Sequence, residues 1–352
     1  MKYFKNNFVA LLVLVLLSNT FIYSIVLETL YGNFEVTEPV LLELLESSCV
    51  NRLRHIQQYG VDNYALKHID YSRHNHSLGV FVLLRAYGAP LKEQIAGLLH
   101  DASHTVFSHV GDSVFDHPDI KDSYQDDIHE WFLNRTDCEN ILSRHALTIA
   151  DILHKNKQFT CLEQDLPDLC ADRLEYNLQG GMLEGLITPL EIREILANLR
   201  FKNGIWYFLD SQRAKKFARL SLYLTEHVWG SPEGLLIDSW AADALKRALA
   251  IDVVTEHEIH FSYDALVWQK LTESTDSIIS EKITKIKNYQ QFFILSNSTD
   301  YDLLLKGKFR GINPWVLVET GFARLTELDP EFAHEFEQLK NLMAHGWYIK
   351  FI

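Results

Sequence analysis

The sequence predicts a mostly α-helical protein with a few short strands. Apolar residues recur every three to four positions through most of the chain, as at Leu41, Leu44 and Leu45, which is the period of an amphipathic helix. Apolar residues make up 47% of the 352 residues and aromatic residues 12%, which suits a buried core and argues against disorder. A chain of this length forms one large domain or two small ones.

In chain order, the same apolar period indicates a series of helical stretches. These cover residues 36–59, 76–87, 91–100, 126–133, 139–153, 160–179, 189–199, 213–229 and 235–250. Glycine and proline mark the ends of several of these helical stretches. Gly88 and Pro90 follow the second stretch, and Gly180 with Gly181 is expected to stop the stretch at 160–179, which has room for one or two helices.

Strands are expected in few places. Residues 205–208 are apolar and aromatic and follow a turn signal at 202–204, so a two-strand excursion is expected there. The C-terminal third mixes helical and extended patterns, with turn signals at Asn297 and at 313–314.

Residues 1–24 have the composition of a signal peptide. Lys2 and Lys5 precede an apolar stretch at 8–17, and small polar residues follow it. The apolar run is short for a membrane-spanning helix, although an uncharged stretch that continues to Val26 is long enough to anchor the chain. A signal peptide is the first expectation and a membrane anchor the second, and either makes the protein exported or anchored. A mis-assigned start before a cytoplasmic enzyme is the third.

Charge and cysteine content narrow the class of protein. Lys plus Arg number 33 and Asp plus Glu 47, a formal net charge of −14, so an extended face for duplex nucleic acid is not expected. A small anionic ligand remains compatible with a local cluster of cations. The cysteines form no Cys-x-x-Cys pair, so free buried thiols are expected rather than a cysteine zinc site. They are Cys49, Cys138, Cys161 and Cys170.

Histidines gather in one part of the chain. Seven of the sixteen lie between Arg73 and Glu130, and His100-Asp101 ends an apolar stretch. On a helix, His100 and His104 would share a face. Histidine nitrogens and carboxylate oxygens together are ligands for a divalent metal ion, which points to a hydrolase that works through metal-bound water.

Three segments in order carry a family resemblance. They are residues 72–79, 100–109 and 172–176, supported by residues 51–60 and 242–245. Together they resemble the HD-domain metal-dependent phosphohydrolases, and within them the branch that resembles deoxynucleoside triphosphate triphosphohydrolases. The resemblance extends from about residue 25 to at least residue 314.

The resemblance implies a fold and a metal site. The fold is an HD-domain helical bundle with extra C-terminal helices, spanning residues 25–352 with a catalytic core at about 50–180. The implied ligands of one divalent metal ion are His76, His100, Asp101 and Asp172. This ligand set suits iron, manganese, nickel or zinc, and magnesium could accompany the substrate phosphates.

The resemblance also implies roles for further side chains. His129 matches the family's general acid, and His104 and His109 match residues that line the site and contact phosphates. The implied substrate-binding residues are Arg73, Arg173, Tyr176 and Gln58. The residues alone leave alternatives without a direct substrate role. His129 could lie on a helix surface, His104 could orient His100, Arg173 could form a salt bridge to Glu175 or a neighbour, and Gln58 could be an ordinary polar helix end.

Some positions depart from the family pattern. His74 stands where phenylalanine is usual, and Ala102 with Ser103 replaces Leu-Gly after the His-Asp pair. Gly180 stands where triphosphohydrolases of this branch have an aspartate for the sugar hydroxyl. This departure puts deoxynucleotide selection in doubt but leaves the metal chemistry untouched.

The expected function is therefore a metal-dependent phosphohydrolase acting on a nucleotide or related phosphate ester, with a deoxynucleoside triphosphate as the first candidate. The alternatives are a phosphomonoesterase of the same family and a non-catalytic module that binds metal or nucleotide. A homo-oligomer is compatible with the sequence.

Overall fold

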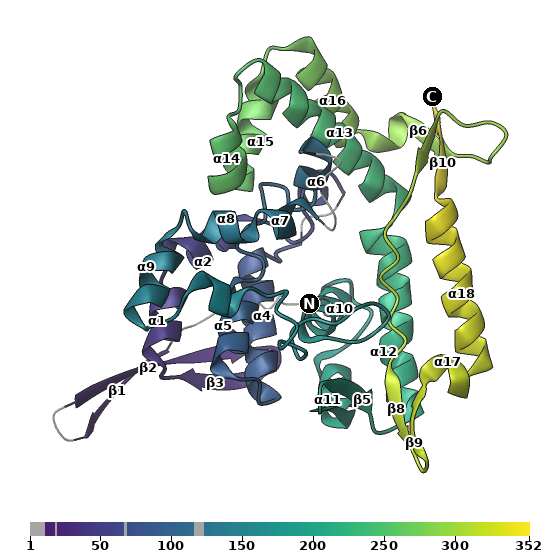
Figure 1. The fold of residues 1–352 in the computed structure, drawn as a ribbon. Helices are drawn as coiled ribbons and strands as arrows, with labels where there is room; N and C mark the ends of the chain where they lie inside the picture. Colours follow the sequence, from purple (N-terminus) through teal and green to yellow (C-terminus); the bar gives the residue numbers. More distant parts are fainter. Residues whose placement is uncertain (1–10, 18–19, 67–68, 116–122) are drawn as a thin grey trace.

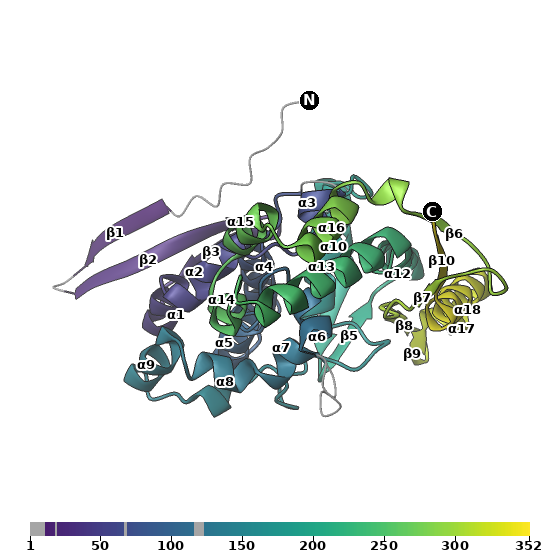
Figure 2. The same ribbon diagram turned by 90° about the horizontal axis from the view of Figure 1, so that it is seen from above.

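The structure is a computed structural model, and it describes residues 11–17, 20–66, 69–115 and 123–352. Helices dominate the described residues, and three small sheets lie toward the edges of the molecule (Figures 1 and 2). The expected fold class, mostly α with a few short strands, is confirmed.

The N-terminal sheet is an antiparallel meander in chain order. Its strands are β1 (Leu11–Leu17), β2 (Thr20–Thr29) and β3 (Gly32–Val36), with Ile25 opposite Val36. The ribbon of β1 and β2 extends away from the helices in both views (Figures 1 and 2).

This sheet lies where a signal peptide or anchor is expected. Residues 11–17 and 20–24 are strands, and residues 1–10 and 18–19 lie outside the described residues. Among the described residues, no helix combines the length and the apolar character needed to cross a membrane. The structure gives the signal peptide no support.

The expectation of a single helix at residues 36–59 is wrong. The segment instead holds three short helices because Ser47 interrupts it: the Ser47 hydroxyl donates to the Leu44 carbonyl and accepts from the Val50 amide. The elements there are α1 (Pro39–Leu45), α2 (Ser48–Arg52) and the 3₁₀ turn η1 (Leu53–His55), followed by α3 (Asp62–Ala65).

The centre of the molecule is a helix pair formed as expected. α4 (Arg73–Ala86) begins at Ser72, whose side chain accepts a hydrogen bond from the Asn75 amide, a standard N-cap. α5 (Leu91–Leu99) follows the turn at Gly88, which has a positive φ of 77°. α4 packs against α5 and against α10 (Figure 1).

The segment between α5 and α10 is less helical than expected. The stretches 126–133 and 139–153 each divide in two, and residues 160–170 are not helical. The elements are α6 (Val110–Val114), α7 (Tyr124–Asp127), α8 (His129–Leu133), α9 (Asp137–Arg144) and the 3₁₀ turn η2 (Ile149–Ile152). Thr148 and Asp151 form a capping box at the start of η2. This new start interrupts the segment, so the apolar period of residues 139–153 does not form one continuous helix.

α10 (Ala171–Leu183) runs through the glycines that were expected to stop it. A side chain at Gly181 would press against Leu220 of α12, and one at Gly180 would lie 3.1 Å from the Trp229 ring. The glycines are therefore packing positions on a helix that contacts α12, rather than a helix end.

The next segment agrees with the sequence expectations. It comprises α11 (Pro189–Asn198), the hairpin β4 (Leu199–Lys202) with β5 (Ile205–Phe208), α12 (Ser211–Leu224), a π-helical turn η3 (Thr225–Trp229) and α13 (Pro232–Ala250). The hairpin turn has positive φ at Asn203 and Gly204.

The C-terminal third mixes helices and strands as expected. Its elements are α14 (Glu256–Phe261), α15 (Asp264–Glu273), α16 (Ser277–Lys287), η4 (Tyr289–Gln291), β6 (Phe293–Leu295), β7 (Leu303–Leu305), β8 (Trp315–Val318), β9 (Gly321–Arg324), α17 (Leu325–Leu328), α18 (Pro330–His345) and β10 (Trp347–Phe351). The sheet orders are β6-β10-β7 and β4-β5-β8-β9, with β5 and β8 parallel.

The described residues form two buried apolar clusters. One gathers α4, α5, α10 and α12, and the other gathers α13, α16 and the loop residues Val106 to Val110. All four cysteines are buried and free, which confirms the expectation for the thiols.

Candidate metal centre and substrate cavity

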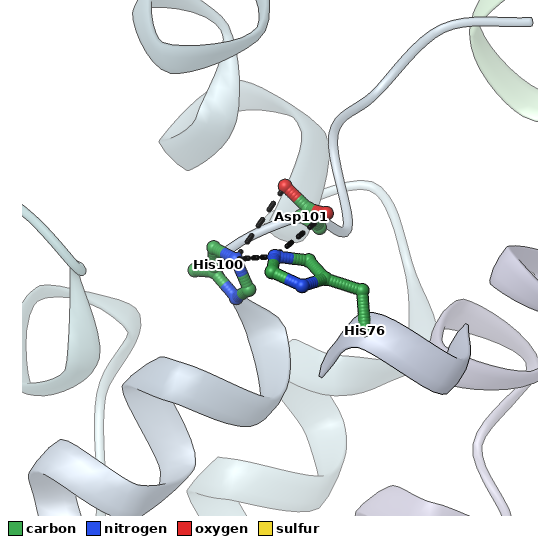
Figure 3. A group of neighbouring side chains, drawn as sticks. All are labelled: His76, His100 and Asp101. Carbon is green, nitrogen blue, oxygen red and sulfur yellow. Dashed lines mark hydrogen bonds and ion pairs between the residues drawn. The ribbon is translucent and has the colours of Figure 1, made fainter. Parts of the chain in front are cut away.

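The ligand residues expected from the sequence come from three elements. His76 lies in the first turns of α4, and Asp172 in the first turn of α10. His100 and Asp101 follow α5, which ends at Leu99, so the expectation that His100 and His104 share a helix face is wrong. The chain turns at Asp101, and this turn aims both side chains at His76 (Figure 3).

The four side chains converge on one point. The Nε2 atoms of His76 and His100 are 3.1 Å apart, and Asp172 Oδ1 lies 2.9 Å from His76 Nε2 and 3.6 Å from His100 Nε2. The carboxylate of Asp101 lies 3.6 Å from His100 Nε2 and 3.7 Å from His76 Nε2. Figure 3 shows both imidazole rings and Asp101 facing one another.

Hydrogen bonds on the far side of each ring test whether this arrangement fits a cation. His100 Nδ1 donates to the Gly97 carbonyl at 2.7 Å, and His76 Nδ1 lies 2.5 Å from the Glu175 carboxylate. Both Nδ1 atoms therefore carry a proton, and each ring turns its Nε2 inward, where a bound metal ion can take the place of a second proton. Two imidazole nitrogens and two carboxylates that face each other suit a cation, so these residues fit a divalent metal ion.

The pKa shifts of the converging side chains also favour a cation at this point. Burial lowers the pKa of His76, but the carboxylates of Glu175, Asp172 and Asp101 outweigh it and raise the pKa to about 10. Burial raises the pKa of Asp101, yet Arg73, His100 and His104 hold it well below its usual range. The cluster holds positive charge strongly, as a metal site must.

Glu175 is a residue that the sequence interpretation missed. Its carboxylate is 1% exposed and accepts from the hydroxyls of Tyr71 at 2.5 Å and Tyr31 at 3.0 Å, besides holding His76. A Cβ at Gly79 would collide with this carboxylate, which explains the glycine in the segment 72–79. The three-residue spacing from Asp172 on one helix was the available signal.

Replacing Glu175 by glutamine is expected to weaken metal binding by about 10- to 100-fold, the usual cost of losing a partner that orients a metal-bound histidine. The amide keeps the volume but holds the Nδ1 proton of His76 less strongly. Metal titration followed by calorimetry measures the effect, with Tyr31→Phe as the control that keeps the carboxylate in place. Unchanged affinity in the glutamine variant contradicts the orienting role.

A cavity of about 850 Å³ opens over the metal cluster. Every site residue expected from the sequence lines it except His129. The residues that line it include Gln58, Arg73, His76, His100, Asp101, His104, His109, Asp172, Arg173 and Tyr176. Volumes of about 300 to 1,000 Å³ are typical of pockets for small-molecule ligands and cofactors.

Arg73 and His104 are both tied to the ligand Asp101. Arg73 Nη1 lies 2.7 Å from Asp101 Oδ2, and its Nε donates to the Ser108 hydroxyl at 2.8 Å. His104 Nε2 lies 3.2 Å from Asp101 Oδ1, and its Nδ1 is buried without a partner. Burial and the nearby Arg73 lower the pKa of His104 to about 3, so the ring is neutral.

Other expected residues occupy the cavity wall. His109 is partly exposed and lies 3.2 Å from Asp112. Arg173 donates to the carbonyls of Gln164 and Asp168, so the alternative of an ion pair with Glu175 is wrong. Gln58 Oε1 is buried with no hydrogen-bond partner, as expected of a group that meets a ligand.

His129 is not among the residues that line the cavity. It is 2% exposed, its Nδ1 is 2.8 Å from the Ser103 hydroxyl, and its Nε2 has no partner. The Ser103 hydroxyl already donates to the Gln125 carbonyl at 2.9 Å, so His129 must donate from Nδ1. The residue is therefore not on a helix surface, and it does not meet the cavity.

Two cations reach the cavity from far along the chain. Lys308 and Arg310 lie in the segment between β7 and β8, and both line the cavity. Within the described residues the Arg310 side chain makes no hydrogen bond or ion pair. Burial lowers the pKa of His109 and raises that of Tyr176 to about 12, and the charge of Arg310 acts on both groups in the downward direction. The alternating cations at Lys306, Lys308 and Arg310 were the sequence signal for this segment.

Comparisons with known proteins bear on the family. No protein-family model matches the chain. YdhJ, an uncharacterized protein of Bacillus subtilis, is 30% identical over 327 residues, which span 92% of this chain and 98% of that protein. The metal-dependent phosphohydrolase cns2 of Cordyceps militaris is 33% identical over 255 residues, which span 71% of this chain and 73% of that protein.

More distant similarities agree. The deoxynucleoside triphosphate triphosphohydrolase SAMHD1 of Bos taurus is 28% identical over 38% of this chain and 26% of that protein. The crystal structure of a phosphohydrolase from Bacteroides thetaiotaomicron superposes with a TM-score of 0.66 at 15% identity, covering 88% of this chain and 95% of that one, so the two share a fold.

The long match to a named relative and the converging His and Asp ligands lead to the same conclusion. The chain belongs to the HD-domain metal-dependent phosphohydrolases, and it is a hydrolase.

Proposed function

We propose that the protein hydrolyses a nucleotide at a single divalent metal ion held by His76, His100, Asp101 and Asp172, with a deoxynucleoside triphosphate as the first candidate substrate. The observation that carries the proposal is the placement of this ligand set in a cavity that cationic and aromatic side chains also line. A bound ion would polarise a phosphoryl oxygen and lower the pKa of water there.

The chain's own residues would bind and orient the phosphates. Arg310 and Lys308 supply positive charge from the side of β7 and β8, and Arg173 supplies it from α10. Arg73 is held by Asp101 and Ser108, so its guanidinium is positioned before a ligand arrives. Several fixed cations in one cavity suit a substrate with more than one phosphate group.

The base and sugar would meet an aromatic wall. Tyr59 and Trp229 lie with ring centroids 5.0 Å apart, and Tyr176 is 6.1 Å from Trp229. All three line the cavity, and Trp229 Nε1 is a buried donor with no partner. Aromatic faces beside a polar donor suit a nucleobase, which favours a nucleotide over a simple phosphomonoester.

The products of the reaction test this proposal. The metal-loaded protein is incubated with deoxynucleoside triphosphates and, separately, with monophosphates, and the products are identified by ³¹P NMR. Tripolyphosphate is the expected product. Inorganic phosphate from monophosphates would show a phosphomonoesterase, and retained metal without any product would show a binding module.

Replacing Arg310 by glutamine is expected to raise KM for a nucleoside triphosphate by about 10- to 100-fold with little change in kcat, since a charged hydrogen bond contributes about 1.5–3 kcal/mol to binding. Arg213→Gln, at an exposed position on α12, is the matched control. Equal KM values for the two variants contradict a role for Arg310 in binding the phosphates.

Weak discrimination between ribo- and deoxyribonucleotides is expected. Gly180 offers no acceptor for a sugar hydroxyl, and the ring of Trp229 lies where the side chain of another residue would begin. A site rejects an analogue strongly only where it makes a dedicated polar contact. Competition of both nucleotide classes in one assay gives the ratio of kcat/KM values, and a ratio above about 10³ would mean that another residue reads the sugar.

A further inference from the structure

A buried phenol contacts the hydrogen bond that orients His76. The Tyr71 hydroxyl donates to Glu175 Oε2 at 2.5 Å, and His76 Nδ1 lies 2.5 Å from the same oxygen. The phenol oxygen is 3.4 Å from His76 Nδ1, and the planes of the two rings stand at 89°. Tyr71 therefore contacts both members of the pair that turns His76 Nε2 toward the other ligand residues.

The direction of these hydrogen bonds follows from the groups that make them. A carboxylate only accepts, so Glu175 Oε1 accepts from the Tyr31 hydroxyl at 3.0 Å, and Oε2 accepts from both Tyr71 and His76. His76 Nδ1 uses its proton on Oε2 and cannot accept from the phenol, so the Tyr71 proton also goes to Oε2. Three donors hold the carboxylate in one orientation, and hydrogen bonds to a charged acceptor are the stronger kind.

Tyr71 is itself held firmly in place. Its backbone carbonyl accepts from the Gln58 amide at 2.8 Å, and its backbone amide donates to the Ile69 carbonyl at 2.9 Å. Its ring packs against that of Tyr59, with centroids 6.3 Å apart, and the residue is only 1% exposed. Because solvent does not reach this depth, water cannot replace the hydroxyl, and its loss leaves Oε2 with His76 as its only donor.

We propose that Tyr71 is a positioning residue of the metal site: its hydroxyl fixes the Glu175 oxygen that holds His76, and so fixes the direction of His76 Nε2. The inference rests on the proposed hydrolysis at a metal ion that His76 helps to hold. Tyr71 is not among the residues that line the cavity, so it acts through Glu175 and not on a substrate. Outer partners of a metal-bound histidine typically change metal affinity by about 10- to 100-fold.

Cobalt binding tests this role. The affinity of the full chain for Co²⁺ is measured by calorimetry, and the visible spectrum of the bound ion reports the geometry of its ligands. Tyr71→Phe is expected to weaken binding by about tenfold, the lower end of the range for an orienting partner, and to change the spectrum. Tyr31→Phe removes the other phenol from the same carboxylate and is expected to change neither. It leaves Oε2 untouched, and Tyr31 is only half-buried, so water can replace its hydroxyl.

A double-mutant cycle shows whether Tyr71 acts through Glu175. In the Glu175→Gln background, adding Tyr71→Phe is expected to lower cobalt affinity by less than about threefold, because the two residues share one hydrogen-bond network. Tyr87→Phe controls for the loss of a phenol hydrogen bond elsewhere: its hydroxyl donates to the Leu196 carbonyl at 3.2 Å, away from the cavity. This control is expected to keep the wild-type affinity and spectrum. Additive losses in the cycle, or an equal loss in Tyr87→Phe, overturn the assignment.

A second readout needs no metal. Histidine-selective ¹⁵N NMR of the metal-free protein follows the His76 ring, with His76→Gln identifying its signals. The Nδ1 signal is expected to move in Tyr71→Phe and to stay in place in Tyr31→Phe and Tyr87→Phe. Unchanged cobalt affinity or an unmoved Nδ1 signal in Tyr71→Phe overturns the inference alone. A wild-type chain that binds neither cobalt nor another divalent ion overturns the proposed function, and the inference with it.

Discussion

Asp101→Asn and His100→Ala are each expected to lose metal binding while the protein stays folded. In the wild type the Nε2 atoms of His76 and His100 lie 3.1 Å apart, and each lies within 3.7 Å of the carboxylates of Asp101 and Asp172, an arrangement that suits a bound metal ion. Removing one ligand leaves three, and the loss appears in metal content before it appears in stability. Elemental analysis of the purified variants, with circular dichroism as the check on folding, measures both quantities.

The choice of asparagine at position 101 matters. Asp101 also pairs with Arg73, which is 3% exposed, and alanine there would leave a buried guanidinium without its partner. Such a loss costs about 3–5 kcal/mol and would mix unfolding with loss of metal. His145→Ala and Asp243→Ala, at positions away from the cavity, are the matched controls. Full metal occupancy in both ligand variants would show that these residues do not hold the ion.

Asp264→Ala is expected to lower the free energy of unfolding by about 3 kcal/mol and to impair the site at the same time. The carboxylate is 1% exposed and accepts from the backbone amides of Phe107 and Gln57, both at 2.8 Å. Each buried donor left without a partner costs about 1–3 kcal/mol. Phe107 and Ser108 hold positive φ angles of 59° and 56°, a conformation that needs support from outside the loop.

Loss of the Asp264 carboxylate is also expected to affect the cavity. Ser108 holds Arg73, and Gln57 precedes Gln58 on the cavity wall, so a relaxed loop would move two groups that we propose bind substrate. Urea unfolding measures the stability, and metal titration with KM measures the site. Asp276→Ala is the matched control, because its carboxylate also accepts from two backbone amides but lies at a solvated helix start. Equal losses in the two variants would contradict the role assigned to Asp264.

Elements defined by local pattern were predictable from the sequence. α4, α5, α11 and α13 follow their apolar period, α4, α11 and α13 also have side-chain caps, and the hairpin of β4 and β5 follows its turn. The extent of α10 was not, because Gly180 and Gly181 usually end a helix and only their contacts with Trp229 and Leu220 explain why they lie inside one. Tertiary packing there overrides local propensity.

The candidate site was likewise predictable only in part. Ordered motifs predicted the four side chains that converge, because their residue types and spacing are local. Glu175 was not identified, since its position depends on a contact with His76 that the fold makes. Arg310 enters the cavity from a segment remote in sequence. His129 was expected in the site from its motif, and the structure places it outside the residues that line the cavity.

The central claim is that hydrolysis depends on the metal held by His76, His100, Asp101 and Asp172. The most direct measurement follows the release of phosphate-containing product from a nucleotide panel before chelation, after removal of the metal, and after its return. The account predicts activity that disappears with the metal, returns with a divalent ion, and never returns in Asp172→Asn. Activity that persists in the metal-free protein, or equal recovery in Asp172→Asn, would contradict it.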